Sequence, residues 1–456
     1  MPCPYTGIMN DLTNTDHVFH REVGRDYPVA ARASGVYIYD TAGRRYLDGA
    51  GGYFVVNIGH GVTEIGAAIA DQLARFANAH TSHFTSEAEQ KFADRLIALA
   101  PKGFAKVWMS TSGSAANETA LKLVRHYHLV NGEPQRTRII ARWNAYHGGT
   151  IGSLSMTGQP RRRDPFEPYL LDFPHIEPPY CYRCPFNLTN PGCGIACADA
   201  LEREIRRVGP QYVAAFIVEP VSGGPLGALV PPAEYLPRIR EICDRHGILM
   251  IVDEIITAAG RTGRNFGVDH WGVVPDIITA AKGIGGGYLP IGAVIVHHRV
   301  YDAFERKGQS FRHGETFAGH SVVAAAGLAT LEYLERHDLI RRAAEMGAVL
   351  GARLKTLAAL PLVGDVRGLG LLWGLELVRD KATKAPFPRA LNVSDMVARE
   401  CANRGLLVVP GVGAVDGIDG DTVSLAPPYI ITRAEIAELV TILGQAIEAV
   451  AQKLGA

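Results

Sequence analysis

Two charged side chains, Asp253 and Lys282, stand at the ends of two apolar runs, and their types and positions suggest shared chemistry. The run 248–252 leads into Asp253, and the run 277–281 leads into Lys282. Such short apolar runs predict buried strands of a parallel sheet, and open α/β sheets bind ligands beyond the carboxyl ends of their strands. An amine there can act as a nucleophile while a carboxylate holds a cationic ring. Pyridoxal phosphate requires both, a lysine for its Schiff base and an acid for its pyridinium nitrogen.

Each of these residues also has a purely structural interpretation. Asp253 could cap a helix or pair with a buried cation, and Lys282 could be a surface lysine in the glycine-rich turn that follows it. A lysine desolvated at a strand end instead has a lowered pKa, which frees its amine. The glycines at 283, 285, 286 and 287 match a dinucleotide-binding fingerprint poorly, because its last glycine and its downstream acid are missing. A nucleotide-dependent oxidoreductase is therefore the weaker interpretation.

A Ser-Gly-Ser turn, Ser112-Gly113-Ser114, lies between a predicted strand at 106–109 and a predicted helix at 115–130. The first turn of a helix has unpaired N–H groups and a partial positive charge, so it can hold a phosphate without a lysine. Simple helix capping by Ser112 or Ser114 explains the same residues. The turn lacks the Gly-Lys-Ser/Thr ending of a nucleotide-binding P-loop.

The elements that would position these groups alternate between strand and helix from about 106 to 296. This order predicts an α/β fold with a mostly parallel sheet covered by helices on both faces. After Gly319 long helices and short strands predict a smaller α+β unit, which the hairpin at 35–48 is expected to join. We therefore expect residues 1–60 to belong to a small domain, 61–325 to form a large domain, and 326–456 to complete the small one.

The composition excludes several classes of protein. Among 456 residues, 46 basic side chains balance 46 acidic ones, so no net charge favours nucleic acid or an anionic membrane. The N-terminal residues lack the pattern of a signal peptide, and no apolar run approaches the roughly 18 residues of a spanning helix. We expect a cytoplasmic protein.

Taken together, these motifs resemble those of the class III (ω-amino acid type) aminotransferases, pyridoxal-phosphate enzymes of fold type I. The resemblance runs from about 46 to about 428 and implies a large domain with a seven-stranded, mostly parallel sheet and a smaller domain built from both termini. The segments that carry it, in order, are 112–118, 146–148, 219–220, 253–255, 260–263, 275–276 with 282–283, and 316–320.

The resemblance implies catalytic roles for two residues and cofactor contacts for several more. Lys282 would form the Schiff base and then move a proton between the substrate and the cofactor, and Asp253 would pair with the pyridinium. Glu219 would orient groups around the ring oxygen of the cofactor. The remaining implied contacts are Ser112, Gly113 and Ser114 to the phosphate, Tyr146 and Ile255 to the two ring faces, and His147 beside them.

Thr316 is implied to reach the phosphate of a neighbouring subunit, so the resemblance implies a homodimer or a tetramer of such dimers. Without the family, Thr316 would be interpreted as a turn residue and Tyr146 as a core aromatic. The implied small-molecule partners are an amine and a keto acid.

The expected substrate depends on where the chain departs from the family. Many members that use 2-oxoglutarate carry an arginine at the position of Ser424, and no arginine occurs here between Arg404 and Arg433. Because a serine cannot supply the charge of a guanidinium fork, we expect either an amine-type substrate or a carboxylate that is anchored elsewhere, and pyruvate rather than 2-oxoglutarate as acceptor. Ser424→Arg should then improve the use of dicarboxylate acceptors. Tyr53 and Phe54 match family positions that line the substrate pocket, which favours an apolar or aryl side chain.

Four cysteines, Cys181, Cys184, Cys193 and Cys197, lie in a segment rich in proline and tyrosine. Their paired spacing suits tetrahedral zinc, although the middle interval is short. Buried thiols or a disulfide are the favoured explanation, and in each case we expect a structural role away from catalysis.

Two other functions use the same residues. A racemase, decarboxylase or lyase would employ the same lysine and cofactor, because the pocket selects which bond breaks. An inactive relative that only binds ligands is disfavoured, since Lys282 and Asp253 are both present.

Overall fold

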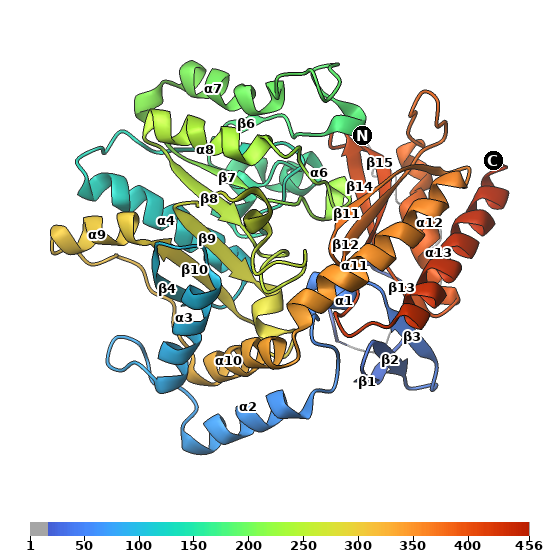
Figure 1. Cartoon of the computed structure of the whole chain (residues 1–456), viewed down its shortest axis with the longest axis horizontal. Helices are drawn as coiled ribbons and strands as arrows, with labels where there is room; N and C mark the ends of the chain where they lie inside the picture. The colour runs from blue at the N-terminus through green and yellow to red at the C-terminus, as the bar shows by residue number, and fades with distance from the viewer. Residues whose placement is uncertain (1–16, 456) are drawn as a thin grey trace.

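A seven-stranded sheet lies at the centre of the computed structural model, which describes residues 17–455. Five adjacent strands run parallel, while β10 pairs antiparallel with both β9 and β4. The predicted mostly parallel α/β sheet is thereby confirmed (Figure 1). In spatial order the strands are β4 (Phe104–Ser110), β10 (Gly292–His297), β9 (Ile277–Ala281), β8 (Leu249–Asp253), β7 (Val213–Val218), β5 (Arg138–Arg142) and β6 (His175–Ile176).

The inner strands are buried along their whole length because helices cover both faces of the sheet. Successive side chains of a strand point to opposite faces, so β8 divides its residues between two cores. Leu249 and Ile251 pack with α4 (Gly113–Val130) and α9 (His298–Arg306). Met250 and Val252 belong to the larger core on the other face. The helices that contribute to that core include α3 (Glu87–Leu99), α7 (Ala196–Val208), α8 (Tyr235–His246) and α10 (Ser321–Arg336).

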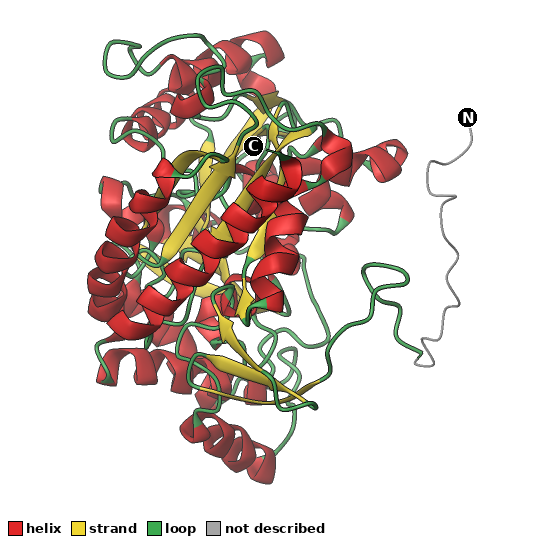
Figure 2. Cartoon of the chain, turned by 90° about the vertical axis from the view of Figure 1, so that its right-hand side faces the viewer, coloured by secondary structure: helices red, strands yellow, loops and turns green. Residues whose placement is uncertain are grey.

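The C-terminal part forms a second sheet in the order β11-β12-β15-β14, with all neighbours antiparallel. Figure 2, which faces this side of the molecule, shows long helices lying across its strands. The strands are β11 (Val363–Leu369), β12 (Leu372–Leu377), β14 (Val409–Val415) and β15 (Asp419–Leu425), and the helices are α11 (Leu339–Thr356), α12 (Val393–Asn403) and α13 (Arg433–Leu454).

The two ends of the described chain meet in a third sheet. β1 (Ala30–Ser34), β2 (Tyr37–Asp40) and β3 (Arg45–Asp48) form an antiparallel meander, and β3 pairs in parallel with β13 (Leu406–Leu407). This pairing agrees with the expectation that the N-terminal hairpin joins the C-terminal unit, while the domain boundaries at 60 and 325 stay a prediction. Helix α2 (Thr63–Arg75) continues the chain towards the large sheet. Among the described residues, no helix is long and apolar enough to cross a membrane.

Candidate active site

A cavity of about 310 Å³ opens beyond the carboxyl ends of β8 and β9. It brings together nine residues that the sequence suggested, from five separate segments of the chain: Ser112, Gly113, Ser114, Tyr146, His147, Glu219, Asp253, Ile255 and Lys282. Sequence reasoning missed the mostly small or apolar rest of the wall: Val55, Thr111, Gly148, Val221, Ile256, Ala281, Leu289, Pro290 and Ile291.

Asp253 is the last residue of β8 and is 5% exposed. Its Oδ2 atom lies 2.8 Å from Nδ1 of His147 and accepts a hydrogen bond of 2.8 Å from Nδ2 of Asn117. The backbone N–H of Ile255 donates to Oδ1 at 3.1 Å. A buried carboxylate held on three sides in this way has a fixed orientation.

Asn117 was not identified as a site residue from the sequence, although it lies in the segment that carries the family resemblance. It is fully buried on α4 and also donates to the backbone oxygen of His147 at 2.7 Å. A polar side chain on the core-facing stripe of a helix was the signal that could have found it. Through Asn117, the first turns of α4 fix the position of Asp253.

Lys282 follows the last residue of β9 and adopts a left-handed backbone conformation, with φ of 47°. Its Nζ atom lies 5.4 Å from the centre of the Phe54 ring. Burial lowers the pKa of the Lys282 ammonium from its ordinary 10.5 to about 8, although the carboxylates of Asp253 and Glu219 oppose this shift. A substantial neutral fraction of amine is therefore present at mildly alkaline pH, which a nucleophile requires.

The N-terminus of α4 forms one end of the cavity. Ser112 caps the helix, since its hydroxyl accepts a hydrogen bond of 3.1 Å from the N–H of Ala115, and Ser114 accepts one of 3.1 Å from the N–H of Gly149. The capping interpretation is thus correct, and it leaves the helix N–H groups directed at the cavity end as a potential anion site. At Gly113 an added Cβ would lie only 2.8 Å from Cδ1 of Ile255, so glycine permits this close approach of helix and turn.

Glu219 lies beside this group after β7 and is 5% exposed. Burial raises the pKa of its carboxyl, while His147 and Arg142 oppose the shift. Nη2 of the buried Arg142 is 3.7 Å from Oε2 of Glu219 and donates to the Glu219 backbone oxygen at 3.0 Å. Oε2 of Glu219 and Nε2 of His147 are both buried without a hydrogen-bond partner among the described residues. Two residues that line one cavity and each leave a polar atom without a hydrogen bond indicate that a polar ligand completes the site.

Four other predicted site residues lie off the wall of this cavity. Phe54 is buried beside Lys282, and the neighbouring Tyr53 is 48% exposed. Ser424 is 1% exposed within β15, paired with residues of β12 and β14. Thr316 is exposed in the turn before α10. Their substrate and subunit roles stay predictions.

The four clustered cysteines are free thiols that line one small cavity of about 20 Å³. Burial raises the pKa of Cys197 to about 11, and the neighbouring thiols act in the same direction. Across residues 17–455, no three His, Cys, Asp or Glu side chains are arranged to hold a metal ion. The segment has a structural contact instead, because Arg183 donates from Nε to the buried Glu376 of β12 at 2.5 Å.

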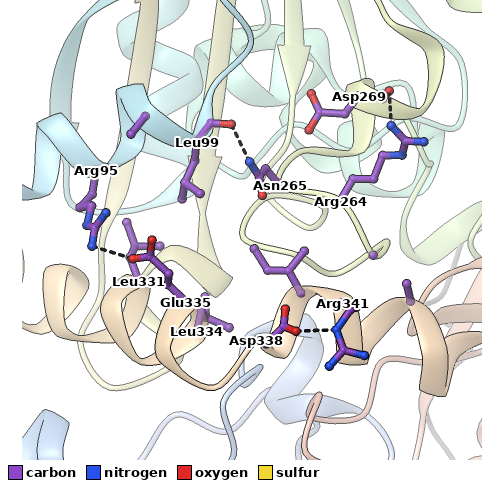
Figure 3. Close-up of a pocket in the computed structure, with 14 residues that line it drawn as sticks. Arg95, Leu99, Arg264, Asn265, Asp269, Leu331, Leu334, Glu335, Asp338 and Arg341 are labelled. Carbon is purple, nitrogen blue, oxygen red and sulfur yellow. Dashed lines mark hydrogen bonds and ion pairs between the residues drawn. The ribbon is translucent and has the colours of Figure 1, made fainter.

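A larger cavity of about 730 Å³ lies elsewhere, between α3, α10, α11 and the loop at 263–269 (Figure 3). Four of its charged side chains form ion pairs: Arg95 pairs with Glu335 at 2.6 Å, and Arg341 pairs with Asp338 at 2.5 Å. It contains none of the predicted catalytic residues.

Comparisons with known proteins agree with this geometry. The family model described as aminotransferase class III matches residues 19–447. The putrescine–pyruvate aminotransferase of Pseudomonas aeruginosa is 36% identical over 428 residues, which are 92% of this chain and 90% of that protein. An (S)-enantioselective ω-transaminase from Thermomicrobium roseum superposes with a TM-score of 0.88 at 38% identity, covering 93% of both chains. The ω-transaminase of Pseudomonas jessenii, solved in complex with PMP, gives 0.87 at 32% identity, covering 94% of both.

Proposed function

This chain belongs to the class III aminotransferases, which are pyridoxal-phosphate enzymes of fold type I, and we propose that it moves an amino group from an amine or ω-amino acid to pyruvate. The observation that carries the proposal is the placement of Lys282 and Asp253 in one cavity with the N-terminus of α4. A ping-pong cycle follows from this assignment, since donor and acceptor would use the same cavity in turn.

The residues present fit the cofactor. Bound pyridoxal phosphate would supply an electron sink for the substrate carbanion and would carry the amino group between the two half-reactions. The helix N-terminus suits its phosphate, and the buried carboxylate of Asp253 suits its ring nitrogen. The unpartnered atoms of Glu219 and His147 suit a group with polar substituents between them.

We assign each chemical task to a residue of this chain. Lys282 would hold the cofactor and then move the proton at the substrate Cα, a task that its lowered pKa supports. Asp253 would keep the ring nitrogen protonated, while Asn117 and His147 hold its carboxylate in place. Tyr146 and Ile255 would flank the ring, and Glu219 would orient its oxygen substituent.

The acceptor and donor classes rest on the charges around the cavity. Lys282 is the single lysine or arginine on its wall in the described chain, and the acids Glu219 and Asp253 line the same cavity. Such a wall favours a monocarboxylate over a dicarboxylate acceptor, which supports pyruvate. The relative from Pseudomonas aeruginosa, named a putrescine–pyruvate aminotransferase, has the same pairing of an amine donor with this acceptor.

The test is a screen of half-reactions followed by the visible absorbance of the bound cofactor. We expect amines to bleach this absorbance and pyruvate to restore it faster than 2-oxoglutarate. Lys282→Ala should abolish both changes. Turnover of the amine without any keto acid would contradict the proposal, because only a racemase or lyase needs no acceptor.

We further propose a homodimer, alone or paired into a tetramer, in which Thr316 reaches the site of the partner. Two observations support this: Thr316 is exposed, and the adjacent Glu315 accepts a hydrogen bond of 3.4 Å from the cavity-lining Thr111. Mixed dimers of Lys282→Ala and Thr316→Arg chains should contain one intact site and recover activity. No recovery in verified mixed dimers would show that Thr316 does not act across subunits.

A cytoplasmic location is also proposed. The six cysteines of the described chain are all free, which suits a reducing compartment. Localisation of a tagged chain by cell fractionation tests this assignment.

A further inference from the structure

The proposed acceptor carries a carboxylate next to its reacting carbon, and the described cavity wall offers that group no cation other than Lys282. Lys282 is committed to the cofactor under the proposed function, and the wall formed by the described residues carries the acids Asp253 and Glu219 but no arginine. A carboxylate taken from water without a cation or several hydrogen-bond donors is strongly disfavoured. The sequence between Arg404 and Arg433 holds no arginine. A cation close to the cavity wall would supply the missing partner.

Arg162 lies next to one residue of the cavity wall. Its guanidinium carbon is 4.7 Å from the centre of the Tyr146 ring, and Tyr146 lines the cavity and is 38% exposed. This stacking places a permanent positive charge against a side chain of the cavity wall. The other arginines near the site are already engaged: Arg142 and Arg261 are each 1% exposed and donate to backbone oxygens.

The helix that carries Arg162, α6 (Pro160–Arg163), is firmly anchored. Arg163 is 8% exposed and donates to the backbone oxygens of Ser155 at 3.0 Å and Thr157 at 3.1 Å. The hydroxyl of Thr157 accepts a hydrogen bond of 2.9 Å from the backbone N–H of His147, a residue of the cavity wall, which links α6 to that wall.

The guanidinium of Arg162 is fixed at Nε, while its two terminal nitrogen atoms are available to a ligand. Nε donates to Oε1 of the buried Gln159 at 2.5 Å, which fixes the plane of the guanidinium. The two terminal Nη atoms make no hydrogen bond to another residue of the described chain. A fork with a fixed plane and free terminal donors is the arrangement that binds a carboxylate bidentately.

The neighbouring hairpin closes over the same helix. A Cβ added at Gly417, in the turn between β14 and β15, would lie 2.5 Å from Cδ of Pro160, so the two backbones are in contact. α6 therefore lies between the large sheet and the C-terminal sheet, and a side chain from it can reach the entrance to the site.

We propose that Arg162 binds the carboxylate of the acceptor, and of any amino acid donor, at the mouth of the active site. The inference rests on the proposed function and names the residue that recognises the acid. It assigns no role to Arg162 towards an amine that lacks a carboxylate. A bidentate pair with a carboxylate is worth about 1.5–3 kcal/mol, or roughly 10- to 150-fold in affinity.

The experiment compares substrates with and without a carboxylate in Arg162→Gln, Arg162→Lys and the wild type. For pyruvate we expect kcat/KM to fall roughly 30- to 100-fold in Arg162→Gln, with a smaller loss in Arg162→Lys, which keeps a point charge but no fork. The half-reaction with benzylamine and its reverse with benzaldehyde should stay within about twofold of the wild type. Arg161→Gln, which removes the same charge from the adjacent position, should leave all these values unchanged.

Two outcomes would overturn the inference. Equal losses for pyruvate and for the benzylamine–benzaldehyde pair would show that Arg162 only supports Tyr146, and unchanged kinetics with pyruvate would show that the carboxylate binds elsewhere. The visible absorbance of bound cofactor and the melting temperature report whether each variant is folded and loaded. A wild-type enzyme inactive with every amine would instead contradict the proposed function itself, so the two failures can be told apart.

Discussion

Among single residues, Lys282 has the most informative titration. With a pKa of about 8, roughly a tenth of its amine is neutral at pH 7, half at pH 8 and nine-tenths at pH 9. The rate at which cofactor-free enzyme captures pyridoxal phosphate should therefore rise about tenfold from pH 7 to 9 and then level off. Stopped-flow absorbance measures this rate. Nα-acetyl-lysine, whose side-chain amine is free in solution, serves as the reference for an unshifted amine. A rate that keeps rising tenfold per pH unit to pH 10 would show that Lys282 is not perturbed.

Asp253 is expected to act through its charge rather than its shape. Asp253→Asn keeps an oxygen for Asn117 and His147 but removes the negative charge beside the proposed ring nitrogen. We expect turnover to fall on the order of 100-fold or more while the cofactor content stays within about twofold. The neighbouring buried carboxylate provides the control: Glu254→Gln should retain most of the turnover, because Glu254 is absent from the cavity wall. Equal losses of kcat in the two variants would contradict the assignment.

At the scale of elements, the sequence predicted the helices and strands that have a clear hydrophobic pattern of their own. The strand at 277–281 has the predicted bounds, and the helix predicted at 115–130 begins only two residues earlier, at Gly113, because both segments have clear periodicity. β1, β11 and β14 were missed because these strands contain polar, glycine or proline residues and depend on pairing with distant neighbours. The same dependence on distant neighbours explains which residues of the active site could be predicted from the sequence. Asp253 and Lys282 end their own strands, whereas Asn117 and Arg142 matter only because the fold brings them to those ends.

The turn after β8 is held in place by hydrogen bonds to the side chain of Glu254. Its two carboxylate oxygens accept the N–H groups of Gly267 and Val268, each at 2.7 Å, and Thr257 also donates to it. Replacing it with Gln puts an amide against an N–H donor, so Glu254→Gln should lower the free energy of unfolding by about 1–3 kcal/mol.

This loss should depend on pH with a definite sign. Burial raises the pKa of Glu254 from 4.5 to about 7, so between these values the folded state binds the proton more tightly than the unfolded state. The contribution of Glu254 to stability is therefore greatest near pH 4.5 and falls as the pH rises to 7. The difference in unfolding free energy between wild type and Glu254→Gln, measured in urea, should shrink over this window. A difference that grows with pH would show that the folded carboxyl has no raised pKa.

At the scale of the whole molecule, one arginine joins three distant parts of the chain. Arg261, which follows β8 in the loop at 260–263, is 1% exposed and stacks on Tyr429 at 4.7 Å. It donates to the backbone oxygens of Val56 at 3.2 Å, Leu371 at 3.2 Å and Pro427 at 2.6 Å. The loop of the large sheet is thereby fixed to the N-terminal segment and to the C-terminal sheet. Val55, next to one of these acceptors, lines the active-site cavity.

Arg261 should therefore support both stability and cofactor retention, and Arg342 separates the two effects. Arg342 also donates to three backbone oxygens, those of residues 429–431, but all three lie in one C-terminal segment away from the cavity. We expect Arg261→Lys and Arg342→Lys each to lower the unfolding free energy by about 2–4 kcal/mol, because a lysine cannot reach three oxygens at once. Only Arg261→Lys should also weaken cofactor binding, by about tenfold, since it releases the segment beside Val55. Urea denaturation and cofactor titration measure the two effects. Equal cofactor affinities in both variants would show that the junction at Arg261 stabilises the fold without shaping the site.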